Sequence, residues 1–82
     1  MITAFVSISV TPGDDERIVK DLLRDKIIQE AWLTIGEFDV LLVMTGKDTE
    51  EINQYVNDRI RGIEGVIRVV VAFGIQSITH DA

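Results

Sequence analysis

The chain has 82 residues, and its 14 Asp and Glu against 8 Lys and Arg give a formal net charge of −6. This length is sufficient for one domain, which we expect to span residues 1–82. The acidity argues against direct nucleic-acid binding and against an anionic membrane surface, because contacts to phosphate depend on Lys and Arg. No apolar run approaches the roughly 18–20 residues of a membrane span, and the N-terminus lacks the basic stretch of a signal peptide, so a cytoplasmic location is expected.

The chain combines high hydrophobicity with no means of covalent cross-linking. Hydrophobic residues make up 46% of the sequence, with 12 Ile and 10 Val against 5 Leu, and there is no cysteine. The lack of cysteine excludes disulfides, thiolate metal sites and Cys nucleophiles. A domain this small hides only about 60–65% of its unfolded surface and usually needs a further source of stability. Association with copies of the same chain is the leading candidate for that source.

The hydrophobic pattern predicts six elements in the order βαββαβ. The first strand, Thr3–Val10, alternates apolar and polar side chains and is broken by the Pro-Gly pair that follows it. A helix is predicted over residues 14–26, where apolar residues recur at helical spacing after three acidic ones. The next two strands are predicted at Glu30–Ile35 and Phe38–Thr45.

Glycines and capping residues predict the turn between the second and third strands and the elements of the second half of the chain. Gly36-Glu37 is predicted to form a tight connection in which the glycine is free to take a positive φ. Asp48 and Glu51 have the spacing of a capping box and predict a helix from Asp48 to about Ile63, followed by glycines that favour its termination. The last predicted element is a long strand, Val66–Ile78.

These elements define a fold with one uncovered sheet face. Right-handed crossovers and a central hairpin place the strands in an antiparallel sheet of order 4-1-3-2, with both helices on one face. This is the ferredoxin-like α+β fold, which by itself is silent on function. The third and fourth strands carry apolar side chains on both faces: Leu41 and Val43 against Val40 and Leu42, and Val69 and Val71 against Val70 and Ala72. We therefore predict a sheet-to-sheet homodimer or a larger closed ring.

Few residues are suited to catalysis or metal binding. His80 is the one histidine and lies near the end of the sequence, where a solvated side chain is expected. Ser7 and Ser9 lie on a strand with no general base visible in the sequence. The acidic runs at 14–16 and 50–51 open predicted helices, a position that the helix dipole favours by itself. The chain is therefore predicted not to be an enzyme, and no cofactor and no metal are expected.

The basic residues form one grouping, Arg59, Arg61 and Arg68. Arg59 and Arg61 fall in the last turn of the second helix, where they suit the negative end of the dipole or bind an anion. RNA-recognition domains share the βαββαβ order but read bases with aromatic residues on their central strands. The segment 39–44 has no aromatic residue and the net charge is negative, so this alternative is set aside.

The segment Thr34–Asp39 is the most distinctive stretch of the sequence. Read as structure, it is a hairpin in which the glycine turns the chain and Asp39 bonds nearby backbone donors. Read as a site, it combines free backbone N–H groups, one aromatic ring and two carboxylates, which would suit a small zwitterion. The residues alone leave both interpretations open.

Three stretches also form a recognisable combination. They are Ala4-Phe5-Val6-Ser7-Ile8 followed by Thr11-Pro12-Gly13, then Gly36-Glu37-Phe38-Asp39-Val40-Leu41-Leu42, and then Ile60-Arg61-Gly62-Ile63-Glu64-Gly65-Val66. Together they resemble the effector domain of the Lrp/AsnC transcription regulators, also called the RAM domain. The resemblance covers nearly the whole chain. Its G-x-[aromatic]-D hairpin and I-x-x-I-x-G-V junction are specific in combination.

The resemblance implies the same fold, dimerisation through the sheets, and assembly of dimers into tetramers, octamers or rings. In the family, amino acids or similar small effectors bind between dimers near the G-x-[aromatic]-D loop. The matching positions here are Gly36, Phe38 and Asp39, with Glu37 between them, and Thr34, two positions before the glycine, is also expected at the effector site. Family members normally carry an N-terminal helix-turn-helix, so the chain looks like a stand-alone version that would co-assemble with full-length members.

Two positions depart from the family pattern. Ile35 stands where the family often has Thr before the hairpin Gly, and residues 69–72 are Val-Val-Val-Ala where Thr or Ser is common. Both departures remove hydroxyl groups from the expected effector site. Two alternatives therefore stand beside an amino-acid-sensing module: a structural assembly module with a degenerate ligand site, and a small enzyme of the dimeric α+β-barrel type.

Overall fold

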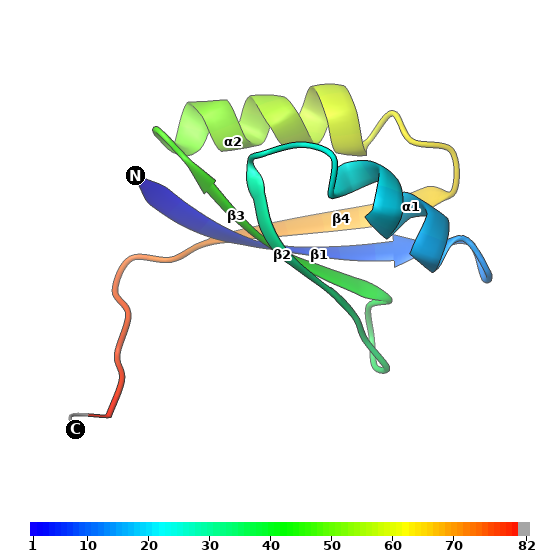
Figure 1. The fold of residues 1–82 in the computed structure, drawn as a ribbon, viewed down its shortest axis with the longest axis horizontal. Helices are drawn as coiled ribbons and strands as arrows, with labels where there is room; N and C mark the ends of the chain where they lie inside the picture. Colours follow the sequence, from blue (N-terminus) through cyan, green and yellow to red (C-terminus); the bar gives the residue numbers. More distant parts are fainter. Residues whose placement is uncertain (81–82) are drawn as a thin grey trace.

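The computed structural model describes residues 1–80, which form a four-stranded antiparallel sheet with both helices on one face (Figure 1). The strand order is β2-β3-β1-β4, which confirms the predicted order 4-1-3-2 and the ferredoxin-like fold. In chain order the elements are β1 (Ile2–Val10), α1 (Asp15–Leu22), β2 (Ile28–Leu33), β3 (Val40–Gly46), α2 (Thr49–Tyr55), the π-helix η1 (Val56–Ile60) and β4 (Val66–Phe73). Neither helix of this part of the chain is long and apolar enough to cross a membrane.

The first helix is shorter than the predicted span of residues 14–26. After Leu22 the backbone tightens into three-residue turns, in which Asp25 N–H donates to Leu22 O at 3.0 Å and Ile28 N–H donates to Asp25 O at 3.1 Å. These turns reverse the chain early and bring the Ile28 side chain into the core. The second strand therefore begins at Ile28 and ends at Leu33, ahead of the predicted Glu30–Ile35.

The connection between β2 and β3 is also different from the prediction. A loop of residues 34–39 replaces the tight turn at Gly36-Glu37, and β3 begins at Val40 instead of Phe38. Gly36 does not take a positive φ, whereas Gly13 and Gly65 do, at 90° and 100°. The left-handed glycines thus lie in the connections that lead into α1 and β4.

The last strand ends at Phe73, five residues before the predicted end at Ile78. The reason is that β4 is an edge strand whose one neighbour is β1. The pairing of these strands reaches Ala4 with Phe73, and a final bond joins Gly74 N–H to Thr3 O at 2.8 Å. Beyond this point residues 74–80 leave the sheet, although β1 continues to Ile2, which still pairs with Gly46 of β3 (Figure 1).

The second helix begins as predicted and ends in a π-helical turn. Asp48 caps it by accepting a 2.8 Å hydrogen bond from Glu51 N–H, while Glu51 Oε1 accepts from Lys47 N–H. Its buried side chains recur every four residues, at 52, 56 and 60. In an α-helix each such step advances about 40° beyond a full turn. The wider π-helical turn at 56–60 reduces this drift and keeps the buried side chains on the sheet.

The core lies between the sheet and the helices, and the opposite sheet face is open. The core contains Ala4, Val6, Ile8, Val10, Ile18, Leu22, Ile28, Val40, Leu42, Met44, Ile52, Val56, Ile60 and Val69. The alternation along the strands places a second apolar set on the opposite face, which we call the open face: Phe5, Trp32, Leu41, Val43, Val70 and Ala72. The prediction that β3 and β4 carry apolar side chains on both faces is therefore confirmed.

Candidate functional site

The loop of residues 34–39 brings all five predicted site residues together at one end of the sheet. Thr34 closes it, because Thr34 N–H donates to Asp39 O at 2.9 Å and the Thr34 hydroxyl donates to Phe38 O at 2.8 Å. Between these two points the N–H groups of residues 35–38 have no protein acceptor within the described part of the chain. The loop therefore contains four consecutive backbone donors without a protein partner, the type of group that can bind an anion.

Asp39 holds this loop to the first strand. Its N–H donates to Ile8 O at 2.9 Å, and its Oδ2 accepts a 2.9 Å hydrogen bond from Val10 N–H. The two bonds extend the β1–β3 ladder beyond its last residue pair, Ile8 with Val40. The structural interpretation of Asp39 is thus correct for one oxygen, while Oδ1 has no protein donor among residues 1–80.

Glu37 and Phe38 meet Arg68, which comes from β4. An Arg68 Nη2 atom lies 3.5 Å from Glu37 Oε2, and the Arg68 guanidinium lies 4.7 Å from the centre of the Phe38 ring. More than half of each charged side chain is exposed, so water screens the ion pair and it contributes little to stability. The contact instead places a cation, a carboxylate and an aromatic face within reach of one small molecule.

Arg68 is the functional candidate that the sequence interpretation missed, because it grouped this residue with Arg59 and Arg61. The structure separates them: Arg68 pairs with Ser9 on the sheet and faces the loop, whereas Arg59 belongs to η1 in the helical layer. Strand alternation was the available signal, since it places Arg68 on the same face as Val70. The sheet order then brings the start of β4 near the end of the β2–β3 loop.

Arg59 is held in a polar network between the helices, so it is not free to bind an anion. Its Nε donates to Asp25 Oδ2 at 2.9 Å and its Nη1 donates to Asp21 Oδ2 at 3.0 Å. The Tyr55 hydroxyl donates to the same Asp25 oxygen at 2.6 Å. Arg61 Nε has a separate partner, Asn57 Oδ1, at 3.1 Å.

This network shifts the protonation equilibria of its members. The hydrogen bond from Arg59 lowers the pKa of Asp21. The hydrogen bond from Tyr55, followed by that from Arg59, lowers the pKa of Asp25. Burial, together with the bond to Asp25, raises the pKa of Tyr55 above its ordinary value of 10.0. The shifts favour ionised Asp21 and Asp25 and a neutral Tyr55 hydroxyl that donates to Asp25, so the network fastens α1 to the second helix.

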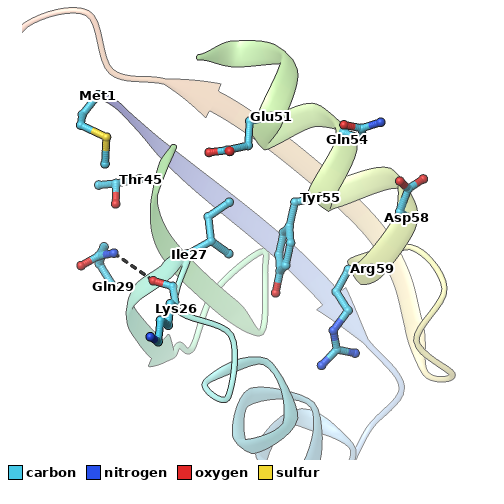
Figure 2. A pocket seen from close by; sticks show the side chains of 10 residues that line it. All are labelled: Met1, Lys26, Ile27, Gln29, Thr45, Glu51, Gln54, Tyr55, Asp58 and Arg59. Carbon is cyan, nitrogen blue, oxygen red and sulfur yellow. Dashed lines mark hydrogen bonds between the residues drawn. The ribbon is translucent and has the colours of Figure 1, made fainter. Parts of the chain in front are cut away.

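A groove with a volume of about 620 Å³ lies beside this network (Figure 2). Ile27 and Tyr55 line it, and Lys26, Gln29, Gln54 and Arg59 contribute polar groups to it. A second hollow of about 510 Å³ lies where residues 74–77 leave the sheet next to Phe5. Neither of these two hollows is lined by residues 34–39.

The remaining acidic residues and the histidine that could have served in catalysis or metal binding show no arrangement that suggests either role. Asp14 pairs with Arg17 at 3.3 Å, and Glu16 pairs with Lys20 at 3.9 Å, along α1. His80 is exposed. Within residues 1–80 no three His, Asp or Glu side chains are grouped so that they could hold a metal ion.

Comparison with known proteins agrees with the fold. The family model described as the Lrp/AsnC ligand binding domain matches residues 3–82. The HTH-type transcriptional regulator FL11 of Pyrococcus furiosus is 29% identical over 72 residues, which is 85% of this chain and 48% of FL11. The chain spans about half the length of the curated relatives it matches.

Solved structures show the same architecture. TTHA0845 from Thermus thermophilus has a TM-score of 0.90 at 25% identity, covering 98% of this chain and 100% of that one. The transcriptional regulator NMB0573 from Neisseria meningitidis, solved in complex with L-Met, has a TM-score of 0.84 at 22% identity, covering 96% of this chain and 53% of that one. On the family match over nearly its whole length, the chain belongs to the Lrp/AsnC ligand-binding domain family.

Proposed function

We propose that this chain is a non-enzymatic module that binds a small amino-acid-like effector at the 34–39 loop and couples binding to its own assembly. The observation that carries the proposal is the run of unpaired N–H groups at residues 35–38 beside the Glu37–Arg68 pair. Its membership of a ligand-binding family and its kinship to transcriptional regulators support the same role. A cytoplasmic location is part of this proposal.

The loop offers complementary groups for both ends of a zwitterion. The N–H groups of Gly36 and Glu37 and the guanidinium of Arg68 would bind the carboxylate. The Glu37 carboxylate and the free Oδ1 of Asp39 would accept hydrogen bonds from the ammonium group. The Glu37–Arg68 contact is long, at 3.5 Å, and exposed, so a ligand can replace it at little cost.

A second subunit is needed to enclose such a ligand. In one chain the loop lies outside both hollows and its tip is fully exposed at Ile35. Small-molecule sites usually bury most of their ligand. We therefore propose that chains dimerise through the open face and that dimers meet at the loops, which would close the site. The L-Met complex of NMB0573 supports an amino acid as the ligand. Mixed assembly with regulators that carry a helix-turn-helix would extend the same contacts.

Isothermal titration calorimetry with each proteinogenic amino acid at millimolar concentration tests this function. We expect heat from at least one amino acid, and at least a tenfold loss of affinity in Arg68→Ala, because a charged hydrogen bond is removed. Arg61→Ala is the matched control, since the Arg61 side chain bonds Asn57, four residues earlier on the same helix. Absence of heat with every amino acid would contradict the proposal.

One set of contacts favours a second candidate, an assembly module whose ligand site has degenerated. The Thr34 hydroxyl already bonds Phe38 O and Asp39 Oδ2 already bonds Val10 N–H of β1, and Val70 and Ala72 present no hydroxyl on the open face. Sedimentation equilibrium separates the two functions. The mass distribution of a sensor changes when its effector is added, whereas that of a purely structural module does not.

A further inference from the structure

Residues 74–80, which we call the arm, project from the end of β4 into solvent. Gly74 N–H bonded to Thr3 O at 2.8 Å is the last tie between the arm and the sheet. Figure 1 shows the arm descending on the side of the sheet away from the helices. The 34–39 loop extends to the same side at the other end of the sheet, so the two segments flank the open face (Figure 1).

The arm carries apolar side chains that its surroundings do not cover. Ile75 is 99% exposed and Ile78 is 84% exposed, while their neighbours Gln76, Ser77 and Thr79 are polar. Exposing two isoleucines on a solvated segment forgoes the free energy of burial, which grows with the apolar area removed from water. These side chains are therefore expected to be covered when the arm meets a partner.

The root of the arm is continuous with the open face. A Cβ atom on Gly74 would lie 3.3 Å from Phe5 Cε2, and Phe5 belongs to the open face. The hollow of about 510 Å³ at this junction is lined by Met1, Ile2, Phe5, Gly74, Ile75 and Ser77. A partner that covers the open face would therefore also reach the hollow and the arm.

We propose that the arm clasps a second copy of this chain. In a sheet-to-sheet dimer, Ile75 and Ile78 of each protomer pack against the partner, and a partner side chain fills the hollow at the root of the arm. A lipid surface fits less well, because residues 74–80 contain no Lys or Arg to contact anionic headgroups. This inference rests on the proposed dimer and adds the segment that secures it.

Sedimentation equilibrium of the full chain over a dilution series tests the arm. We expect Ile75→Ser combined with Ile78→Ser to raise the dimer dissociation constant about tenfold or more, because two apolar side chains no longer become buried. The matched control is Gln76→Ser combined with Thr79→Ser, which changes the same arm but keeps both isoleucines. Both double variants should keep the far-ultraviolet circular dichroism of the parent, since all four side chains are exposed.

The possible results distinguish failure of the arm proposal from failure of the proposed dimer. If the parent dimerises and the isoleucine variant has the same dissociation constant, the arm proposal is overturned while the sheet-to-sheet dimer stands. If the parent is monomeric at every concentration, both proposals fail. A spin label at Gln76→Cys, the one thiol in an otherwise cysteine-free chain, gives a second readout. Its immobilisation on dimerisation supports the clasp, and equal mobility at all concentrations contradicts it.

Discussion

The carboxylate of Asp39 accepts a hydrogen bond from the backbone N–H of Val10 at 2.9 Å, across 29 residues of sequence. This contact fixes one end of the candidate effector loop to β1, which pairs with both β3 and β4. The loop is thus anchored by one carboxylate oxygen, while its tip at 35–38 has no internal hydrogen bonds from its N–H groups. An anchored base with unpaired donors at the tip is a suitable arrangement for binding a ligand without refolding.

The Asp39 anchor predicts a loss of stability on substitution. Asp39→Ala leaves the partly buried Val10 N–H without its acceptor and should lower the free energy of unfolding by about 1–3 kcal/mol. Glu37→Ala, in the same loop but with an exposed carboxylate, should change it by less than about 0.5 kcal/mol. Urea denaturation compares the two, and equal stabilities would show that the anchor is unimportant.

Substitution of Gly36 should affect effector binding without affecting stability. A Cβ at this position meets no atom within 4 Å, and its φ is not positive, so Gly36→Ala should leave the urea midpoint unchanged. The added methyl group lies beside the N–H groups proposed to bind the carboxylate, so effector affinity in calorimetry should fall. A large loss of stability would mean that the glycine has a structural role that the loop geometry does not show.

The Tyr55–Asp25 pair predicts a dependence of stability on alkaline pH. The pKa of Tyr55 is raised in the folded state above its ordinary value of 10.0, so its contribution is complete below pH 10 and is lost as the pH rises further. Tyr55→Phe should cost about 1 kcal/mol at neutral pH through the lost hydrogen bond. The alkaline decline of the melting temperature should then be shallower in Tyr55→Phe, and a decline as steep as in the parent chain would contradict this assignment.

The lowered pKa values of Asp21 and Asp25 predict that the protein also loses stability at acidic pH. Their pKa values lie below the ordinary 3.8 in the folded state, so their contribution is complete above this pH and is lost as the pH falls through the lower folded values. Arg59→Gln removes the partner that both carboxylates share. Melting curves from pH 7 downward should show a smaller acid-induced loss in Arg59→Gln than in the parent, and parallel curves would rule out the network as the cause.

The single tryptophan reports on the open face. Trp32 is 55% exposed and lies opposite Leu41, so a partner sheet would cover it. Its emission should shift to shorter wavelength as protein concentration rises, and Val70→Glu on the same face should abolish the shift. Leu23→Glu is the matched control, because Leu23 is similarly exposed at the end of α1. An equal loss of the shift in both variants would argue against docking through the sheet.

The order and pairing of the strands could be predicted because the apolar pattern changes period at each element. The ends of elements could not, because they depend on tertiary partners. β4 ends at Phe73, where its pairing with β1 reaches Ala4, although the sequence remains apolar at Ile75 and Ile78. α1 stops at Leu22 because three-residue turns are needed to bury Ile28.

The residue types in the sequence indicated the candidate site, but they did not predict its geometry. The loop residues are adjacent in sequence, so their proximity followed from the chain itself. The approach of Arg68 to Phe38 joins segments 30 residues apart and depends on the register of β4 against β1, in which Arg68 pairs with Ser9. The use of Arg59 by Asp21 and Asp25 likewise depends on how the two helices pack, which residue spacing within one helix does not specify.

The coupling of effector binding to assembly is tested most directly by sedimentation equilibrium with and without the amino acid that binds in calorimetry. A ligand enclosed between subunits stabilises the assembly that encloses it. We predict that the effector shifts the mass distribution of the parent chain toward larger oligomers, and that Arg68→Ala shows no shift at the same effector concentration. An unchanged mass distribution of the parent chain at saturating effector would contradict the account.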